Sequence, residues 1–383
     1  MKQPLFLLLA LTATFTLAGS WAQTAPAATV TVPPVTPGAV APGTPEETPV
    51  TPPTASAEFT VAPRVAGGTV RAAWIRPTAD LSAAEAAMGG LAARGYTDVF
   101  VEAFYHGQAI WPSKVAPQNP AFAERDGLHE YADIGEAYGL QVHAWMEVLY
   151  WQPPTKYGLR SVLLQEHPDW ETLDVNGRRS SEVAEGMGFG DPGVYAVRHL
   201  LYDLAAEVAV DDPNVGLHLD YLRYPAGADF GYNPQTVQGF QDENGRRPVR
   251  YLDAPWFGFR RDLVTDLANG MARSYRAAGG LSSVSAAVNA QYPLWHLETL
   301  QDWSRWTGGG RDEFDRGVDV FVPMVYSVST LYLRGLTRYV LGRSPRPVWL
   351  GLRIGAGFPR LEELVAAAEA EGARNYAVFD ALP

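Results

Sequence analysis

The feature that most constrains the fold is a regular alternation, after about residue 65, of short apolar runs rich in β-branched residues with segments of helical spacing. The runs expected as strands are Val70–Ile75, Asp98–Ala103, Gln141–Glu147, Gly216–Tyr221, Ser283–Val288, Val318–Tyr326, Val348–Leu352 and Tyr376–Phe379. The helical segments include Ala83–Arg94, Tyr131–Tyr138, Tyr195–Val208, Phe257–Ala278 and Leu361–Glu371. Strands alternating with helices favour a parallel sheet, and eight repeats in about 320 residues predict a closed (β/α)8 TIM barrel.

An open, doubly wound α/β sheet is the alternative architecture. Such a sheet typically carries a glycine-rich phosphate turn directly after its first strand. Here the first strand is followed by Arg76-Pro77-Thr78-Ala79, which contains no glycine. The barrel is therefore the preferred prediction.

The first 22 residues have the pattern of an export signal. Lys2 is followed by the apolar run Leu5–Leu17 and by Ser20-Trp21-Ala22, with small residues where a signal peptidase cuts. An uncleaved anchor is the alternative, but the run is shorter than the roughly 20 residues that span a bilayer. We expect a signal peptide at 1–22, no membrane span in the mature protein, and a secreted or periplasmic location.

Residues 23–63 have a different composition, dominated by Pro, Thr, Ala and Val. A stretch of this kind cannot bury a core and is typical of a polyproline-rich spacer. The predicted organisation is a signal peptide, a disordered linker over 23–63 and one folded domain over 64–383.

Composition excludes several classes of function. The chain has no cysteine, which rules out cysteine-based zinc and iron–sulfur sites and thiol nucleophiles. Its formal net charge of −12 disfavours a nucleic-acid partner, because phosphate backbones are bound mainly by Lys and Arg. A polysaccharide or glycan strand is the expected partner, and no cofactor is predicted.

Acidic residues stand at the carboxyl ends of three consecutive predicted strands, where TIM barrels place their active sites. They are Glu102, Glu147 and Asp220. Side chains alternate along a strand, so Asp220 and His218 point inward, whereas Leu217, Leu219 and Tyr221 form the outer face. Neighbouring carboxylates split their pKa values, which is what general acid and base catalysis needs.

Two cations are expected beside these acids. Arg76 ends the first strand, and Arg223 follows Asp220 by three residues. Either could balance the charge of the carboxylates. A purely structural ion pair between Arg223 and Asp220 is the alternative for that position.

The sequence resembles the glycosyl hydrolase-like family 10, which is similar to amylase-like (β/α)8 glycosidases. The resemblance covers about Val70 to Tyr326. Its landmarks are Arg71-Ala72-Ala73-Trp74-Ile75, Val99-Phe100-Val101-Glu102-Ala103, Ala109-Ile110-Trp111-Pro112-Ser113, Gly139-Leu140-Gln141-Val142-His143-Ala144-Trp145, Leu217-His218-Leu219-Asp220-Tyr221-Leu222-Arg223-Tyr224-Pro225, Asp302-Trp303-Ser304-Arg305-Trp306 and Val318-Asp319-Val320-Phe321-Val322-Pro323-Met324-Val325-Tyr326. The resemblance implies a glycosidase with Asp220 as nucleophile, and cell-wall glycan among the possible substrates.

The chain departs from the amylase-like pattern at two strand ends. Amylase-like enzymes end the fifth strand with a glutamate acid, but here that strand ends in Asn289. The seventh ends in Arg353. The proton donor must come from elsewhere, and Glu147 is the first choice, with Glu102 second.

Aromatic and polar residues near the expected rim complete the predicted site. Aromatic rings stack on the C–H faces of sugars, and Trp111, Trp151 and Trp295 lie in expected loops. The residues expected to bind substrate are Arg76, His106, Trp111, His143, Trp145, Trp151, His218, Arg223, Asn289, Trp295 and Tyr326.

Three functions remain compatible with these patterns. The first is an exported glycoside hydrolase that uses Asp220 and Glu147. The second is a noncatalytic glycan-binding barrel, suggested by the missing fifth-strand glutamate. The third is a metal-dependent, deacetylase-like hydrolase with His143 and His218 among its ligands.

Overall fold

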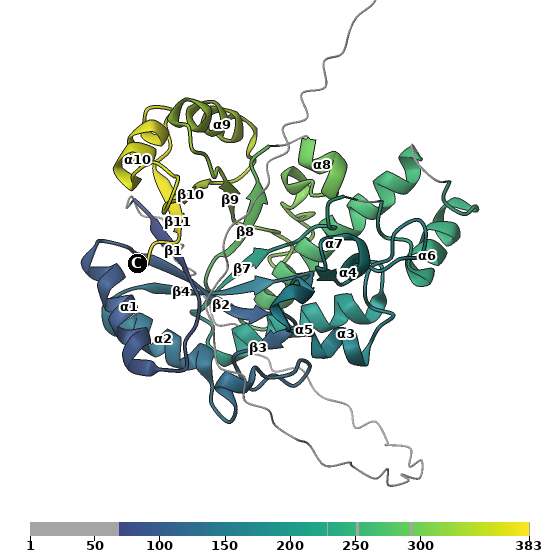
Figure 1. Ribbon diagram of the computed structural model, residues 1–383, viewed down its shortest axis with the longest axis horizontal. Coiled ribbons are helices and arrows are strands. Elements are labelled where there is room, and N and C mark those ends of the chain that lie inside the picture. Colours follow the sequence, from purple (N-terminus) through teal and green to yellow (C-terminus); the bar gives the residue numbers. More distant parts are fainter. Residues whose placement is uncertain (1–68, 228, 250–252, 292–293, 383) are drawn as a thin grey trace, which may run out of the picture. The chain divides into compact units, whose positions relative to one another are not determined.

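The computed structural model describes residues 69–382 except 228, 250–252 and 292–293. The predicted signal peptide and linker lie outside the described residues. Within the described part, eight parallel strands form a closed barrel (Figure 1). They are β1 (Arg71–Ile75), β2 (Asp98–Tyr105), β4 (Gln141–Glu147), β7 (Gly216–Asp220), β8 (Val284–Asn289), β9 (Val320–Met324), β10 (Trp349–Arg353) and β11 (Asn375–Phe379). Each pairs with its neighbour, and β1 closes the ring with both β2 and β11. The predicted TIM barrel is confirmed.

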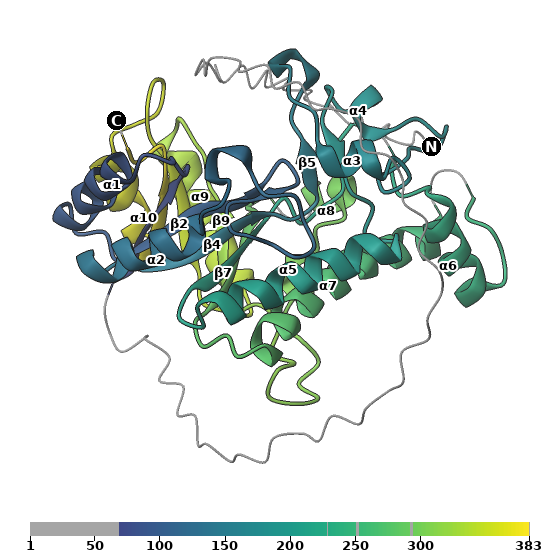
Figure 2. The ribbon, with the colours of Figure 1, turned by 90° about the horizontal axis from the view of Figure 1, so that it is seen from below.

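Helices follow the strands and cover the barrel. The larger ones are α1 (Leu81–Ala93), α2 (Gly127–Tyr138), α5 (Tyr195–Asp211), α6 (Pro234–Asn244), α7 (Ala254–Ala277), α9 (Thr330–Arg343) and α10 (Leu361–Glu369). Figure 2 shows α5 and α7 side by side. None of the described helices is long and apolar enough to cross a membrane.

Local sequence explains where the helices begin and end. The Asp80 carboxylate accepts hydrogen bonds from the backbone at the start of α1, and Asp126 does the same for α2. Gly139 ends α2 with φ 69°, a left-handed conformation that glycine adopts without strain. Helix α9 was not predicted, because its sequence mixes arginines and glycines with apolar residues.

A long connection after β4 departs from the simple barrel. It contains the antiparallel pair β5 (Tyr150–Gln152) and β6 (Gly188–Phe189) and the short helices α3 (Val162–Glu166) and α4 (Ser180–Val183). Figure 2 shows this group at one end of the barrel. Strand β3 (Gln108–Ala109) pairs antiparallel with the end of β2, and α8 (Leu294–Thr299) follows β8. These additions surround the carboxyl ends of β2, β4 and β7.

The lower half of the barrel interior holds a polar network enclosed by aromatic rings. We call Trp74, Asp98, Phe100, His143, His218 and Ser285 the lower network. The Trp74 indole N–H donates to His218 Nε2 over 3.0 Å, and His218 Nδ1 lies 2.8 Å from Ser285 Oγ. The His218 ring stacks on Phe100 with centroids 3.8 Å apart. Side chains therefore fill the barrel below the rim.

Candidate active site

Three carboxyl groups meet at the carboxyl end of the barrel. Glu102, Glu147 and Asp220, named here the carboxylate cluster, have exposed fractions of only 5%, 5% and 8%. Glu147 and Asp220 are register partners on adjacent strands β4 and β7, and Glu102 is paired with Trp145 on β4. The charge of Asp220 raises the pKa of both glutamates, and the charge of Glu102 also raises the pKa of Glu147. The structure thus brings together the three acids expected from the sequence.

Glu102 is held by Arg76. Arg76 Nε lies 3.3 Å from Glu102 Oε2. Burial raises the pKa of Glu102 to about 7, although Arg76 opposes that rise, and the charge of Asp220 adds to it. An irregularity in the pairing of β2 with β4 follows Glu102, so that Phe104 pairs with Met146. Such a bulge changes the direction of the following residues, and here it precedes the turn at His106.

Glu147 is held by the turn that follows β2. The backbone N–H of His106 donates to Glu147 Oε2 over 3.1 Å. His106 has φ 52° and Gly107 has φ 75°, two successive left-handed residues that turn this N–H toward the carboxyl group. Burial raises the pKa of Glu147 well above its ordinary value, and the charge of Glu102 raises it further. Glu147 is therefore the group best suited to carry a proton near neutral pH.

Asp220 has more donors around it. Burial raises its pKa to about 6. The backbone N–H of Tyr221, the charge of Arg223 and the indole of Trp145 oppose that rise. The Tyr221 N–H donates over 2.7 Å and Trp145 Nε1 over 3.2 Å. Hydrogen bonds to a carboxylate favour its charged form. These donors therefore favour the charged form of Asp220, whereas burial and the charge of Glu102 favour the protonated form of Glu147.

The end of β7 differs from the predicted alternation. The strand ends at Asp220, and Tyr221 has φ 50°, which is unusual for a bulky residue. The Tyr221 ring stacks on Tyr150 with centroids 4.7 Å apart instead of packing under the outer helices. Its expected place on the outer face is wrong, because the left-handed residue interrupts the strand. Tyr221 thus lies beside the acids, a place that sequence reasoning missed because no local signal marks its conformation.

Arg223 lies against aromatic rings of the same group. Its guanidinium carbon is 5.4 Å from the ring centroid of Phe189 and 5.3 Å from that of Tyr221. Nη1 donates to the carbonyl of Tyr224 over 3.1 Å. The expected alternative of an ion pair with Asp220 is not formed within 4.0 Å among the described residues, although each group influences the pKa of the other.

Tyr326 and Asn289 border the site in different ways. Tyr326 follows β9, and the negative charge of Asp220 raises the pKa of its hydroxyl, as burial does. Asn289 ends β8, where its side-chain oxygen accepts from the N–H of Gln291 over 2.9 Å. Its own N–H donates to Gln301 over 2.7 Å. Asn289 thus shapes the loop after β8.

Two histidines expected to contact substrate lie in the lower network instead. His218 is 0% exposed with both ring nitrogens engaged, and His143 is 1% exposed with Nε2 2.9 Å from Asp98 Oδ1. Burial lowers the pKa of His218 well below its usual value. Both stand one or two inward positions below the strand ends, and contact of either with substrate stays a prediction. Among the described residues, no group of three or more His, Asp or Glu side chains is arranged to hold a metal ion.

The proposed tryptophan platforms are also internal. Trp111 is 3% exposed and donates to Glu207 of α5 over 3.0 Å, while Trp151 is 0% exposed and donates to the carbonyl of Val148 over 2.8 Å. Neither ring exposes a face to a sugar in this arrangement, so their use as sugar platforms stays a prediction. The side chain of Trp295 lies outside what the structure describes. Trp145, also expected to bind substrate, instead positions Asp220 from within the barrel.

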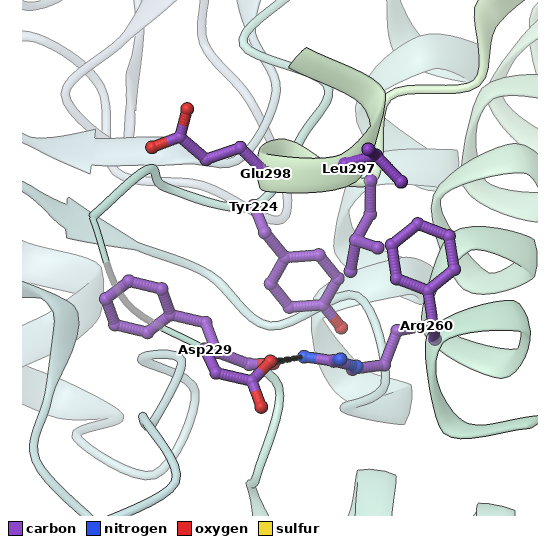
Figure 3. A pocket seen from close by; sticks show the side chains of 8 residues that line it. Tyr224, Asp229, Arg260, Leu297 and Glu298 are labelled. Atoms are coloured by element: carbon purple, nitrogen blue, oxygen red, sulfur yellow. Dashed lines mark hydrogen bonds and ion pairs between the residues drawn. The ribbon is translucent and has the colours of Figure 1, made fainter. Parts of the chain in front are cut away.

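A small cavity of about 60 Å³ lies beside the loop that follows Asp220. Figure 3 shows Tyr224 at its centre, with Glu298 and Leu297 on one side and Asp229 and Arg260 on the other. Arg260 Nη1 lies 2.6 Å from Asp229 Oδ1. The cavity therefore has a polar wall, but the sequence does not single it out.

Residues 72–331 match the family described as glycosyl hydrolase-like 10. The chain belongs to this family. The match covers β1 through β9 and therefore the whole carboxylate cluster. A search of curated proteins finds no match.

Solved structures similar to this member of the glycosyl hydrolase-like 10 family include two glycosidases. The catalytic domain of β-amylase from Paenibacillus polymyxa has a TM-score of 0.56 at 12% identity, covering 81% of this chain and 93% of that one. The β-galactosidase from Bacillus circulans sp. alkalophilus has a TM-score of 0.54 at 14% identity, covering 82% of this chain. The aligned part spans 50% of that β-galactosidase. At these identities the likeness shows the fold.

Proposed function

We propose that the protein is an exported glycoside hydrolase that cleaves a polysaccharide or cell-wall glycan by carboxylate chemistry. The observation that carries the proposal is the unequal hydrogen bonding of two adjacent buried acids. Glu147 and Asp220 are register partners at the barrel rim, where burial raises the pKa of both. Only Asp220 has several donors that favour its charged form. One protonated and one ionised carboxyl group are what glycoside hydrolysis requires.

In this proposal Glu147 protonates the oxygen of the leaving sugar. Asp220 attacks the anomeric carbon, or stabilises the positive charge that develops there. Arg76 favours the charged form of Glu102, and that charge in turn helps Glu147 to keep its proton. The N–H of His106 fixes the direction of the Glu147 carboxyl group.

The pairing of β4 with β7 supports retention of anomeric configuration. Adjacent strands lie about 4.8 Å apart, and a carboxyl separation of about 5 Å is typical of retaining enzymes. After Asp220 forms a covalent glycosyl intermediate, Glu147 removes a proton from the water that releases the sugar. NMR of the first product formed distinguishes the two anomers, and initial formation of the inverted anomer contradicts this part of the proposal.

Release of reducing ends from purified glycan strands and polysaccharides tests the function. Wild-type protein should release them from at least one polymer, whereas Asp220→Asn and Glu147→Gln should not. Full turnover by Asp220→Asn would overturn the assignment. Binding of a polymer without release of reducing ends would instead favour a noncatalytic glycan-binding barrel, which the absence of an acid at Asn289 also suggests.

A further inference from the structure

Arg76, Arg223 and Arg353 end or follow the barrel strands β1, β7 and β10, and Arg223 differs from the other two. Arg76 is paired with Glu102 at 3.3 Å, and Arg353 Nε is 3.1 Å from Asp380 Oδ2. Arg223 has no carboxylate within 4.0 Å in the described part of the chain. The rim therefore contains a guanidinium group whose charge is not matched by a directly bound acid.

The position of Arg223 is nevertheless well defined. Phe189 and Tyr221 contact its guanidinium group, and Tyr150 stacks on Tyr221. One N–H donates to the carbonyl of Tyr224. Since a guanidinium group has five N–H donors, four remain for other partners. Aromatic contacts and one carbonyl thus hold the guanidinium group in place without using all of its N–H donors.

A role confined to keeping Asp220 ionised does not explain this arrangement. Any cation nearby would favour the charged form of Asp220, including a flexible lysine. A planar guanidinium held against aromatic rings is suited to bidentate recognition of an oxyanion. The exposed Glu298 also influences the pKa of Arg223 but does not bind it within 4.0 Å. The arrangement therefore resembles a binding subsite more than a closed ion pair.

The surrounding charge makes such a subsite useful. The carboxylate cluster and the net charge of −12 both repel an acidic ligand. An anionic group would approach this rim only where a cation compensates the repulsion. Arg223 supplies that cation three residues after Asp220.

We propose that Arg223 binds an acidic substituent of the glycan, either a carboxylate or an ester-linked sulfate or phosphate, beside the bond that is cleaved. The inference rests on the proposed function in that it takes the ligand to be a glycan. It adds that the substrate is an acidic glycan, and it names the residue that recognises the acid. The oxyanion accepts two parallel N–H bonds from the guanidinium group.

Equilibrium binding of matched acidic and neutral oligosaccharides tests the proposal. The probes are uronic acid, sulfated and phosphorylated oligosaccharides, each beside its carboxyl-reduced, desulfated or dephosphorylated form. Affinities are measured by calorimetry with Glu147→Gln, which should bind without cleavage. We expect at least one acidic form to bind tenfold or more tightly than its neutral partner, and the class of acid that does so identifies the substituent. Arg223→Gln in the same background should abolish that difference, and Arg223→Lys should keep part of it.

Arg353→Gln is the matched control, because it removes a rim cation that already has an acid partner. It should leave the preference for the acidic form in place. Equal binding of acidic and neutral forms, an equal loss of both in Arg223→Gln, or no binding of any acidic form overturns the proposal. The preference in unmodified protein tests it even if Arg223→Gln fails to fold. Selective binding without release of reducing ends by wild-type protein would contradict the proposed hydrolase but support the role of Arg223.

Discussion

The lower network and the carboxylate cluster lie on the same strands and are similarly buried, yet their polar groups are balanced in opposite ways. In the lower network, Trp74 donates to His218, and His218 bonds to Ser285. Because an indole N–H only donates, His218 Nε2 is the accepting nitrogen and Nδ1 carries the proton. The neutral histidine is satisfied on both sides.

In the carboxylate cluster the negative charges of the acids repel one another. Glu102 and Asp220 raise the pKa of Glu147, and Asp220 raises that of Glu102. Burial adds to each rise, while Arg76 only partly offsets it. The comparison of His218 with the carboxylate cluster teaches that hydrogen-bond partners, as well as burial, distinguish a polar group that stabilises a barrel from groups poised to exchange protons.

The largest expected effect is loss of activity when the cluster loses its donor. Glu147→Gln should reduce kcat/KM by about 10²–10⁴-fold on a natural glycan, because the leaving oxygen no longer receives a proton. On an aryl glycoside with a good leaving group the loss should be much smaller, since departure needs little protonation. Steady-state kinetics on both substrates measure the difference.

Asp220→Asn is the matched control for that experiment. It removes the group assigned to the anomeric carbon, so a better leaving group should not restore its activity. Equal recovery of both variants on aryl glycosides would contradict the separate roles of Glu147 and Asp220. Circular dichroism should show both variants folded.

The next effect is on stability and belongs to the lower network. His218→Ala removes a fully buried ring, leaves the Trp74 N–H without an acceptor, and should lower the free energy of unfolding by about 2–4 kcal/mol. The activity of each folded molecule should change little at temperatures well below its Tm. Urea titration and active-site-normalised kinetics check the two parts. A stable variant that loses activity would place His218 in the functional site after all.

Removing a charge from the carboxylate cluster should raise the free energy of unfolding, whereas His218→Ala lowers it. The pKa of Asp220 is about 6 in the folded protein, compared with 3.8 ordinarily, so the folded state binds more protons between these values. The contribution of Asp220 to the free energy of unfolding therefore falls as pH rises from about 4 to about 6, and the loss is complete above that range. Asp220→Asn removes the charge and should be about 1–3 kcal/mol more stable than wild type at pH 8. Denaturation at pH 4 and pH 8 tests this, and a variant less stable than wild type at pH 8 contradicts it.

The barrel and the members of its carboxylate cluster were predictable because both follow from periodicity. Alternating apolar runs determine the strands, and the carboxyl ends of parallel strands meet at one rim. Glu102, Glu147 and Asp220 could therefore be placed together from the sequence, with Arg76 as a cation near them.

The depth of residues below the rim was less predictable. His143 and His218 share the inward face with Glu147 and Asp220, but alternation alone does not say which layer contacts solvent. Trp111 and Trp151 appeared in loops, yet long connections here pack as extra core. The turn at Tyr221 depends on a left-handed residue, which no side-chain pattern indicates. Tertiary packing decides each of these cases.

The smallest expected effect concerns the hydrogen bond that joins the two regions. Trp145 lies in the barrel interior, and its N–H reaches the Asp220 carboxylate at the rim. Because the active form of Asp220 is ionised, kcat/KM of wild type should fall about tenfold per pH unit below about pH 6. A second fall at higher pH should mark deprotonation of Glu147, whose pKa is raised.

Trp145→Phe removes that N–H and keeps most of the ring. The bond favours the charged carboxylate, so its loss should raise the pKa of Asp220 and move the acid limb to higher pH. A hydrogen bond to a charged group contributes about 1.5 kcal/mol, which corresponds to roughly one pH unit at most when the bond is as long as 3.2 Å. The matched variant Trp74→Phe loses an indole N–H in the lower network and should leave the acid limb unchanged. An acid limb that moves to lower pH in Trp145→Phe, or moves equally in both variants, would show that the rim and the interior are not separated as the structure indicates.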